Sequence, residues 1–171
     1  LPGMLYGDFM RSPHAHARIK KIDTSKAKAV PGVLAVLTAA DLKPLNLHYM
    51  PTLAGDVQAV LAENKVLYQN QEVAFVVADE RYAAADGADL VEVEYEALPC
   101  NVDPFKAMAP DAPVLRDDLA GKTKGAHGAR KHHNHVFTWQ MGDKGATDAA
   151  FKSADVTIKE VISYQRVHPC P

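Results

Sequence analysis

The residues best suited to metal chemistry are histidines, and they occur in two short clusters. His14 and His16 are separated by one residue, and His132, His133 and His135 lie within four positions. Imidazole is a common ligand of transition metals, and positions i and i+2 of an extended segment point to the same side. Each cluster is therefore a candidate metal site, and the second could serve a metal-binding module with no enzymatic activity.

The spacing of both clusters favours structural histidines over a metal. No cysteine or carboxylate stands at ligand spacing from His14 and His16, so we expect rings that form hydrogen bonds locally at a strand edge. Adjacent His132 and His133 point to opposite sides of an extended chain, which leaves only His133 and His135 on one face. We expect this second cluster to be the solvated or interface start of a strand.

Other catalytic patterns do not appear in the sequence. It has no Ser/His/Asp constellation, no carboxylate pair in a recognisable context and no glycine-rich phosphate loop. Cys100 and Cys170 lie far apart, which favours two free thiols over a disulfide framework or a zinc site. We therefore assign no catalytic, cofactor-binding or metal-binding residue.

The first histidine pair is positioned by a predicted strand, a corner and a second strand. Leu5 to Arg11 is rich in aromatic and long apolar residues, and Ser12-Pro13 interrupts it. From Ala15 the pattern alternates with a period of two. It places Ala15, Ala17 and Ile19 on one face, and His16, Arg18 and Lys20 on the other.

A mixed order of helices and strands follows as far as Asp103. The predicted elements are a short helix at 26–29 capped by Thr24-Ser25, a buried strand at 33–37, a helical turn ending at Leu42, an irregular loop at 44–55, strands at 66–68 and 73–78, a helix at 80–92 capped by Asp79, and a strand at 93–95. Asn70 can adopt the positive φ of the turn between two of these strands. Gly87, inside the long helix, has no evident role.

The remaining third of the sequence changes in character. Prolines, glycines and acidic residues predict a linker at 104–134, extended over the surface. After it the sequence predicts a strand at 136–140, a helix at 146–153 with Ala149, Ala150 and Phe151 toward the core, and a strand at 156–164.

Length and charge limit the function classes. The chain has 171 residues with 19 Lys+Arg and 21 Asp+Glu, so nothing favours binding to nucleic acid or to an anionic membrane. No membrane-spanning stretch or signal peptide is predicted. Because the sequence starts at Leu1 and stops just after a predicted strand, we expect a fragment of a longer protein.

The strand-corner-strand stretch carries a family resemblance. Phe9 to Ile19, followed by Ile22-Asp23, Pro31 to Val33 and Val36 to Asp41, resembles the opening of the large subunit of the molybdenum hydroxylases, the xanthine dehydrogenase and aldehyde oxidase superfamily. The resemblance implies an α+β fold. It consists of an α/β hammerhead domain at 1–103, a linker at 104–134 and the first elements of a molybdopterin-binding domain at 135–171. Asn70 departs from the family pattern, which has glycine there.

Several loops resemble the carbon-monoxide-oxidising branch of this family. They lie at 43–52, 69–75, 125–135 and 164–171. This resemblance implies oxidation of carbon monoxide with water to carbon dioxide. It also implies a molybdopterin cytosine dinucleotide with a molybdenum-copper centre in the full subunit, held outside this fragment, since neither Cys100 nor Cys170 matches the motif of the copper cysteine. A family member that acts on an aldehyde or a nitrogen heterocycle is the alternative.

The resemblance also implies partners and a location. The expected partners are a medium subunit with FAD and a small subunit with [2Fe-2S] clusters, in a dimer of heterotrimers. The expected location is the cytoplasm, with association to the inner face of the cytoplasmic membrane as an open alternative. We expect this fragment alone to be poorly soluble or partly disordered, without molybdenum or activity, because strand edges and interface would be exposed.

Overall fold

A computed structural model describes residues 1–47, 49–50, 58–119, 124–125, 128–129, 132–136 and 138–164. These residues divide between two compact units, Leu1–Thr138 and Trp139–Pro171, which are described separately. The mixture of helices and strands agrees with the predicted α+β class. Cys170 and His48 lie outside the described residues, as does part of the predicted loop at 44–55. In the described part of the chain, no helix is long and apolar enough to cross a membrane.

The first sheet of unit 1 is built around a central apolar strand. β5 (Glu72–Ala78) pairs antiparallel with β1 (Tyr6–Arg11) on one side and with β3 (Val33–Thr38) on the other. Phe75 lies opposite Phe9 of β1 and Leu37 of β3. A strand with neighbours on both sides satisfies its backbone fully, which suits the nearly continuous apolar sequence of β5.

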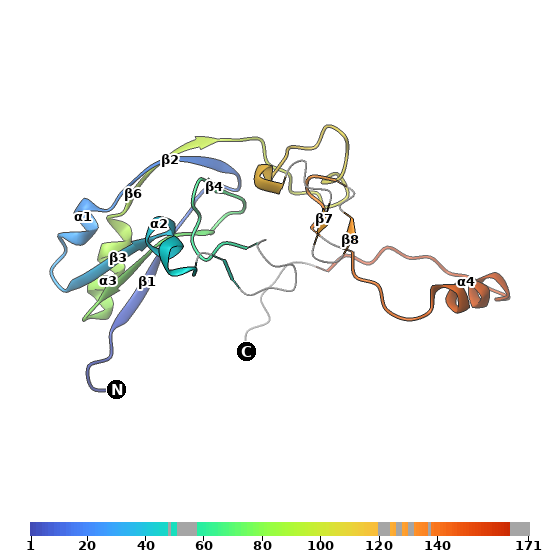
Figure 1. The fold of residues 1–171 in the computed structure, drawn as a ribbon, viewed down its shortest axis with the longest axis horizontal. Coiled ribbons are helices and arrows are strands. Elements are labelled where there is room, and N and C mark those ends of the chain that lie inside the picture. Colours follow the sequence, from blue (N-terminus) through green and yellow to red (C-terminus); the bar gives the residue numbers. More distant parts are fainter. Residues whose placement is uncertain are drawn as a thin grey trace. The chain divides into compact units, whose positions relative to one another are not determined.

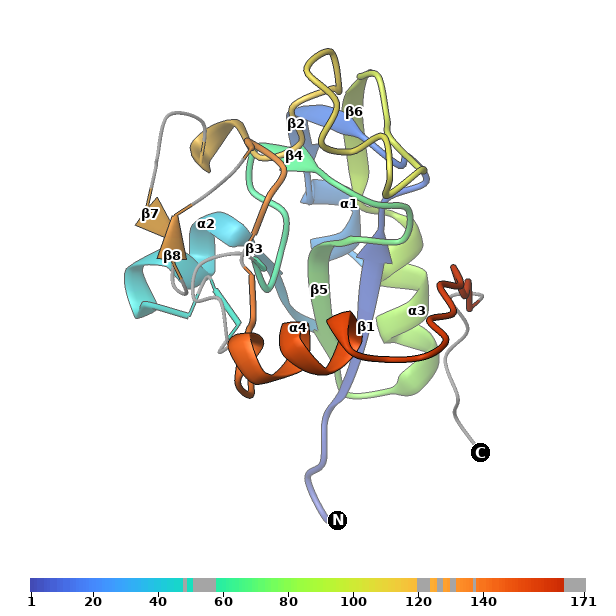
Figure 2. The same cartoon turned by 90° about the vertical axis from the view of Figure 1, so that its right-hand side faces the viewer.

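Two helices cover one face of this sheet. α3 (Arg81–Asp89) packs along β1 and β5, and α1 (Ser25–Lys28) packs beside it. Figure 2 shows β1 and β5 side by side with α3 along them. The buried residues between helices and sheet are Ala27, Val36, Ala74, Val76, Ala88 and Val91. Three of these six residues are alanines and three are valines, so the side chains between the helices and the sheet are small.

The second sheet places the corner that carries His14 and His16. β2 (Ala17–Asp23) lies between β4 (Lys65–Val66) and β6 (Glu92–Ala97), and both pairings are antiparallel. Its core is small and consists of Ala17, Ala62, Val66 and Val73. Val73 belongs to β5, so the two sheets share the interior of unit 1 at this point.

Short elements complete the chain (Figure 1). α2 (Ala39–Leu42) begins with a capping box between Thr38 and Asp41, and a 3₁₀ turn, η1 (Lys43–Leu45), follows. Later come η2 (Asp117–Leu119), the paired β7 (Lys124–Gly125) and β8 (Gly128–Ala129), and α4 (Lys144–Lys152). Asp143 caps α4 by accepting a hydrogen bond from the amide of Ala146 at 2.9 Å, and the helix predicted at 146–153 is confirmed.

Two predicted elements of unit 1 are shorter than expected. α3 ends at Asp89 because Glu92 already pairs with Asp23 in the β2–β6 ladder, and its N-cap is Glu80 rather than Asp79. The strand predicted at 66–68 ends at Val66, since the amide of Leu67 donates to the Gln71 side chain at 2.6 Å instead of to a neighbouring strand. The predicted turn residue Asn70 is confirmed, with φ of 66°.

Two predictions in the last part of the chain are wrong. Neither the described residues of 136–140 nor 156–164 form strands. Both stretches have strand-like sequences, but a strand requires a neighbour for its backbone groups, and within the described residues neither stretch has one. Phe151, predicted to face a core, is 61% exposed.

Candidate functional site

The candidate site is a cleft of about 470 Å³ in unit 1. β2 and β4 supply Ile19 and Lys65, the turn before β5 supplies Tyr68 and Gln71, and the segment around η2 supplies Arg116 and Asp117. We call residues 113–119 the arm, because this stretch closes one side of the cleft. The cleft is the place to look for charged groups that could bind or react.

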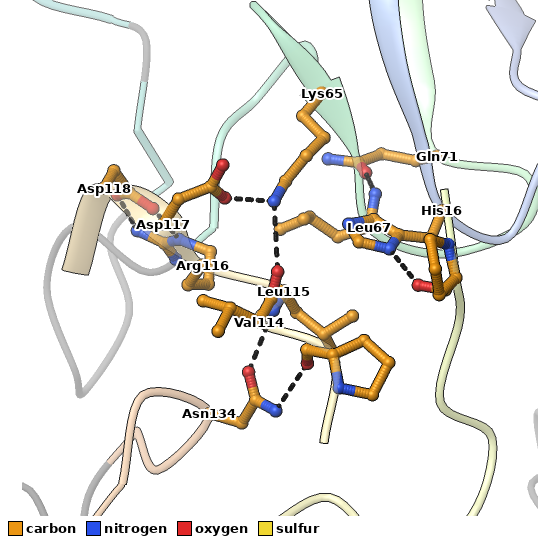
Figure 3. Close-up of polar contacts among 12 residues, drawn as sticks. His16, Lys65, Leu67, Gln71, Val114, Leu115, Arg116, Asp117, Asp118 and Asn134 are labelled. Carbon is orange, nitrogen blue, oxygen red and sulfur yellow. Dashed lines mark hydrogen bonds and ion pairs between the residues drawn. The ribbon is translucent and has the colours of Figure 1, made fainter. Parts of the chain in front are cut away.

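Lys65 joins the arm to the second sheet. Its ammonium group forms an ion pair with Asp117 and donates to the carbonyl of Val114 at 3.4 Å (Figure 3). The Lys65 side chain is only 11% exposed, whereas that of Asp117 is 55% exposed. Burial would raise the pKa of the Asp117 carboxyl, but the hydrogen bond and charge from Lys65 hold this pKa below its usual range.

The other charges of the cleft are also paired. Arg116 makes two hydrogen bonds to Asp118, from Nε at 2.7 Å and from Nη2 at 2.6 Å. Glu63 accepts from Lys43 at 2.8 Å. Since these carboxylates already bind cations of the chain, the arrangement favours holding the arm in place over acid-base chemistry or capture of a charged ligand.

Asn134 fixes the arm from its other side. Its Oδ1 accepts from the amide of Leu115 at 2.9 Å, and its Nδ2 donates to the carbonyl of Pro113 at 2.9 Å (Figure 3). The same Nδ2 also donates to the carbonyl of Ala107 at 2.9 Å. One side chain thus connects three backbone positions. Asn134 lies between His133 and His135, which the sequence offered as candidate metal ligands. The role of Asn134 itself was not predicted, because the sequence carries no signal for contacts so distant along the chain.

Replacing Asn134 should release the arm. Asn134→Ala removes three hydrogen bonds, and at about 0.5–1.5 kcal/mol each we expect a loss of about 2 kcal/mol from arm docking. Asn134→Asp should be at least as damaging, because a carboxylate would face the carbonyls of Pro113 and Ala107. Amide hydrogen exchange at Leu115 measures the effect. An Asn134→Asp variant with unchanged exchange at Leu115 would contradict this role.

The arm should also loosen in acid. The pKa of Asp117 is lower in the folded chain than in the unfolded chain, so its contribution to stability is present above about pH 4 and is lost as the pH falls through the folded value. We expect faster amide exchange in the arm as the pH falls below about 4, after correction for intrinsic rates. Asp117→Asn is the control, because its side chain has no carboxyl to protonate. If amide exchange in this variant depended on pH as it does in the parent, protonation of Asp117 would be excluded as the cause.

The first predicted histidine pair separates into two different environments. The His14 ring is half-buried and lies edge-on to Tyr95, with ring centroids 4.9 Å apart. His16 is 5% exposed and its Nδ1 donates to the carbonyl of Pro99 at 2.5 Å. The prediction that His16 lies on one face with Arg18 and Lys20 is wrong, because His16 is buried whereas those two residues are exposed. His16 precedes β2, and its ring turns inward to the carbonyl of Pro99, which follows β6.

The second histidine cluster forms local hydrogen bonds. The amide of Asn134 donates to His132 Nδ1 at 3.2 Å, and His135 Nε2 lies 2.9 Å from the hydroxyl of Thr138. The rings of His132 and His133 meet edge to face, with centroids 5.4 Å apart. Among the described residues, no group of three or more His, Cys, Asp or Glu side chains could hold a metal ion. Cys100 is an exposed free thiol.

Comparison with known proteins relates this architecture to molybdenum enzymes. Residues 1–99 match the family model described as aldehyde oxidase and xanthine dehydrogenase, a/b hammerhead domain. Over all 171 residues the chain is 74% identical to the carbon monoxide dehydrogenase large chain of Afipia carboxidovorans, of which it spans 21%. It is 34% identical over 174 residues to the nicotine 6-hydroxylase large subunit of Paenarthrobacter nicotinovorans, covering 99% of this chain and 20% of that subunit.

A solved structure agrees with these relatives. The crystal structure of the Cu,Mo-CO dehydrogenase in its carbon-monoxide-reduced state superposes with a TM-score of 0.77 and 76% sequence identity. The match covers 91% of this chain and 20% of that chain. Because the family model matches more than half of the 171 residues, the chain belongs to the aldehyde oxidase and xanthine dehydrogenase a/b hammerhead family.

Proposed function

We propose that these residues work as part of the large chain of a carbon monoxide dehydrogenase. Such an enzyme oxidises carbon monoxide with water to carbon dioxide and releases two protons and two electrons. One observation carries the proposal: the identity of 74% extends over all 171 residues, although the family model ends at residue 99. Loops and connections diverge most readily between relatives of different function, so similarity along 100–171 points to this activity rather than to the family in general.

The metals of such an enzyme do not fit the described residues of this chain. The related solved structure is that of a Cu,Mo enzyme, which uses copper and molybdenum. Here Cys100 is exposed and the described histidines and carboxylates form no ligand group. We therefore propose that the molybdenum-copper centre and its molybdopterin cytosine dinucleotide are bound by other parts of the large chain, and that the described residues of this chain carry no catalytic step.

The contribution of this chain is then architectural. In unit 1 two antiparallel sheets share one interior, and paired charges and Asn134 hold the arm against the second sheet. Such a unit offers a rigid surface to the rest of an assembly. We propose a medium subunit with FAD and a small subunit with [2Fe-2S] clusters as partners, in a dimer of heterotrimers located in the cytoplasm. These partners rest on the similarity to the large chain of Afipia carboxidovorans.

A graft tests the proposed function. The matching segment of the Afipia carboxidovorans large chain is replaced by these 171 residues, and the chimera is produced with the partner subunits of that enzyme. We expect an assembled complex that binds molybdenum and copper and reduces a dye with carbon monoxide as electron donor. The reason is that 74% of the residues of the segment are identical in the parent.

A second chimera serves as the matched control. It carries the corresponding segment of the nicotine 6-hydroxylase large subunit, to which this chain is 34% identical. We expect this control to assemble poorly and to show little reduction of the dye by carbon monoxide. If both chimeras assemble and react equally well, the segment does not distinguish the carbon-monoxide-oxidising branch. If the first chimera fails to assemble, the alternative of another molybdenum hydroxylase gains support.

A further inference from the structure

We draw no further inference here: the strongest candidate, the partly exposed aromatic face of the first sheet formed by Phe9 of β1 and Phe75 of β5, carries nothing, because no contact in the described part of the chain shows what covers it.

Discussion

Gly87→Leu should strongly destabilise unit 1. A Cβ atom at Gly87 would lie 2.8 Å from Val76 Cγ1 and 3.0 Å from Val33 Cγ2, so α3 rests directly on the first sheet. The site offers no room for a larger side chain. Extra atoms in a packed core cost about 1–3 kcal/mol and sometimes more, and we expect about 3 kcal/mol at this position. Exchange of the slowest amides of β5, measured in the full-length chimera, reports this free energy.

A neighbouring exposed position provides the control for Gly87→Leu. Asp86→Leu adds the same side chain to the same helix, but Asp86 is exposed, and we expect a change within about 0.5 kcal/mol. Gly87→Ala should fall between the two, since the gain in helix propensity of about 1 kcal/mol opposes the close contact with Val76. If the amides of β5 exchanged at similar rates in Asp86→Leu and Gly87→Leu, α3 would not pack this closely against the first sheet.

His16→Ala should have an effect of similar size. The substitution removes a buried ring together with its hydrogen bond to the Pro99 carbonyl. That carbonyl then loses the His16 ring as its donor. A cavity and an unpaired acceptor together should cost about 3 kcal/mol. The amide of Leu98 donates to the His16 carbonyl at 2.9 Å, so the start of β2 and the end of β6 should separate together. Amide exchange at Leu98 measures this separation.

His14→Ala is the matched control for His16→Ala. Both positions lose an imidazole ring from the same corner, but the His14 ring is half-buried and makes an edge contact with Tyr95. We expect less than about 1 kcal/mol from its removal. Equal effects of the two substitutions on exchange at Leu98 would contradict a special role of the His16 ring.

Local sequence signals predicted most of unit 1. Val33 to Leu37 and Val73 to Ala78 are continuous apolar runs, and they form the strands β3 and β5. Asn70 marks a turn because it tolerates positive φ better than other non-glycine residues, and the turn has that conformation. Such features depend on a few neighbouring residues and can therefore be seen in the sequence.

Features that depend on distant contacts could not be predicted. Gly87 appeared to be only a weak point of a helix, whereas contact with Val76 and Val33 explains it. The alternation around His16 indicated a common face with Arg18 and Lys20, but a partner 83 positions away, Pro99, turns the ring inward. The predicted strand at 156–164 has the right pattern and lacks a neighbour within the described residues.

The pairing of Lys65 with Asp117 belongs to the same class. The two residues are 52 positions apart, and nothing near either one indicates that they meet. The cleft and its arm were therefore not predicted. By contrast, the family was identified from the corner at Phe9 to Ile19, because a short run with an unusual composition is specific without knowledge of any distant contact.

The rate of carbon monoxide oxidation per bound molybdenum, measured in the chimera that carries these 171 residues, tests the central claim most directly. If the segment supplies architecture to a carbon monoxide dehydrogenase and no reacting group, this rate should equal that of the Afipia carboxidovorans parent within about twofold, even where less complex assembles. A chimera that binds a full complement of molybdenum but no longer oxidises carbon monoxide would contradict it.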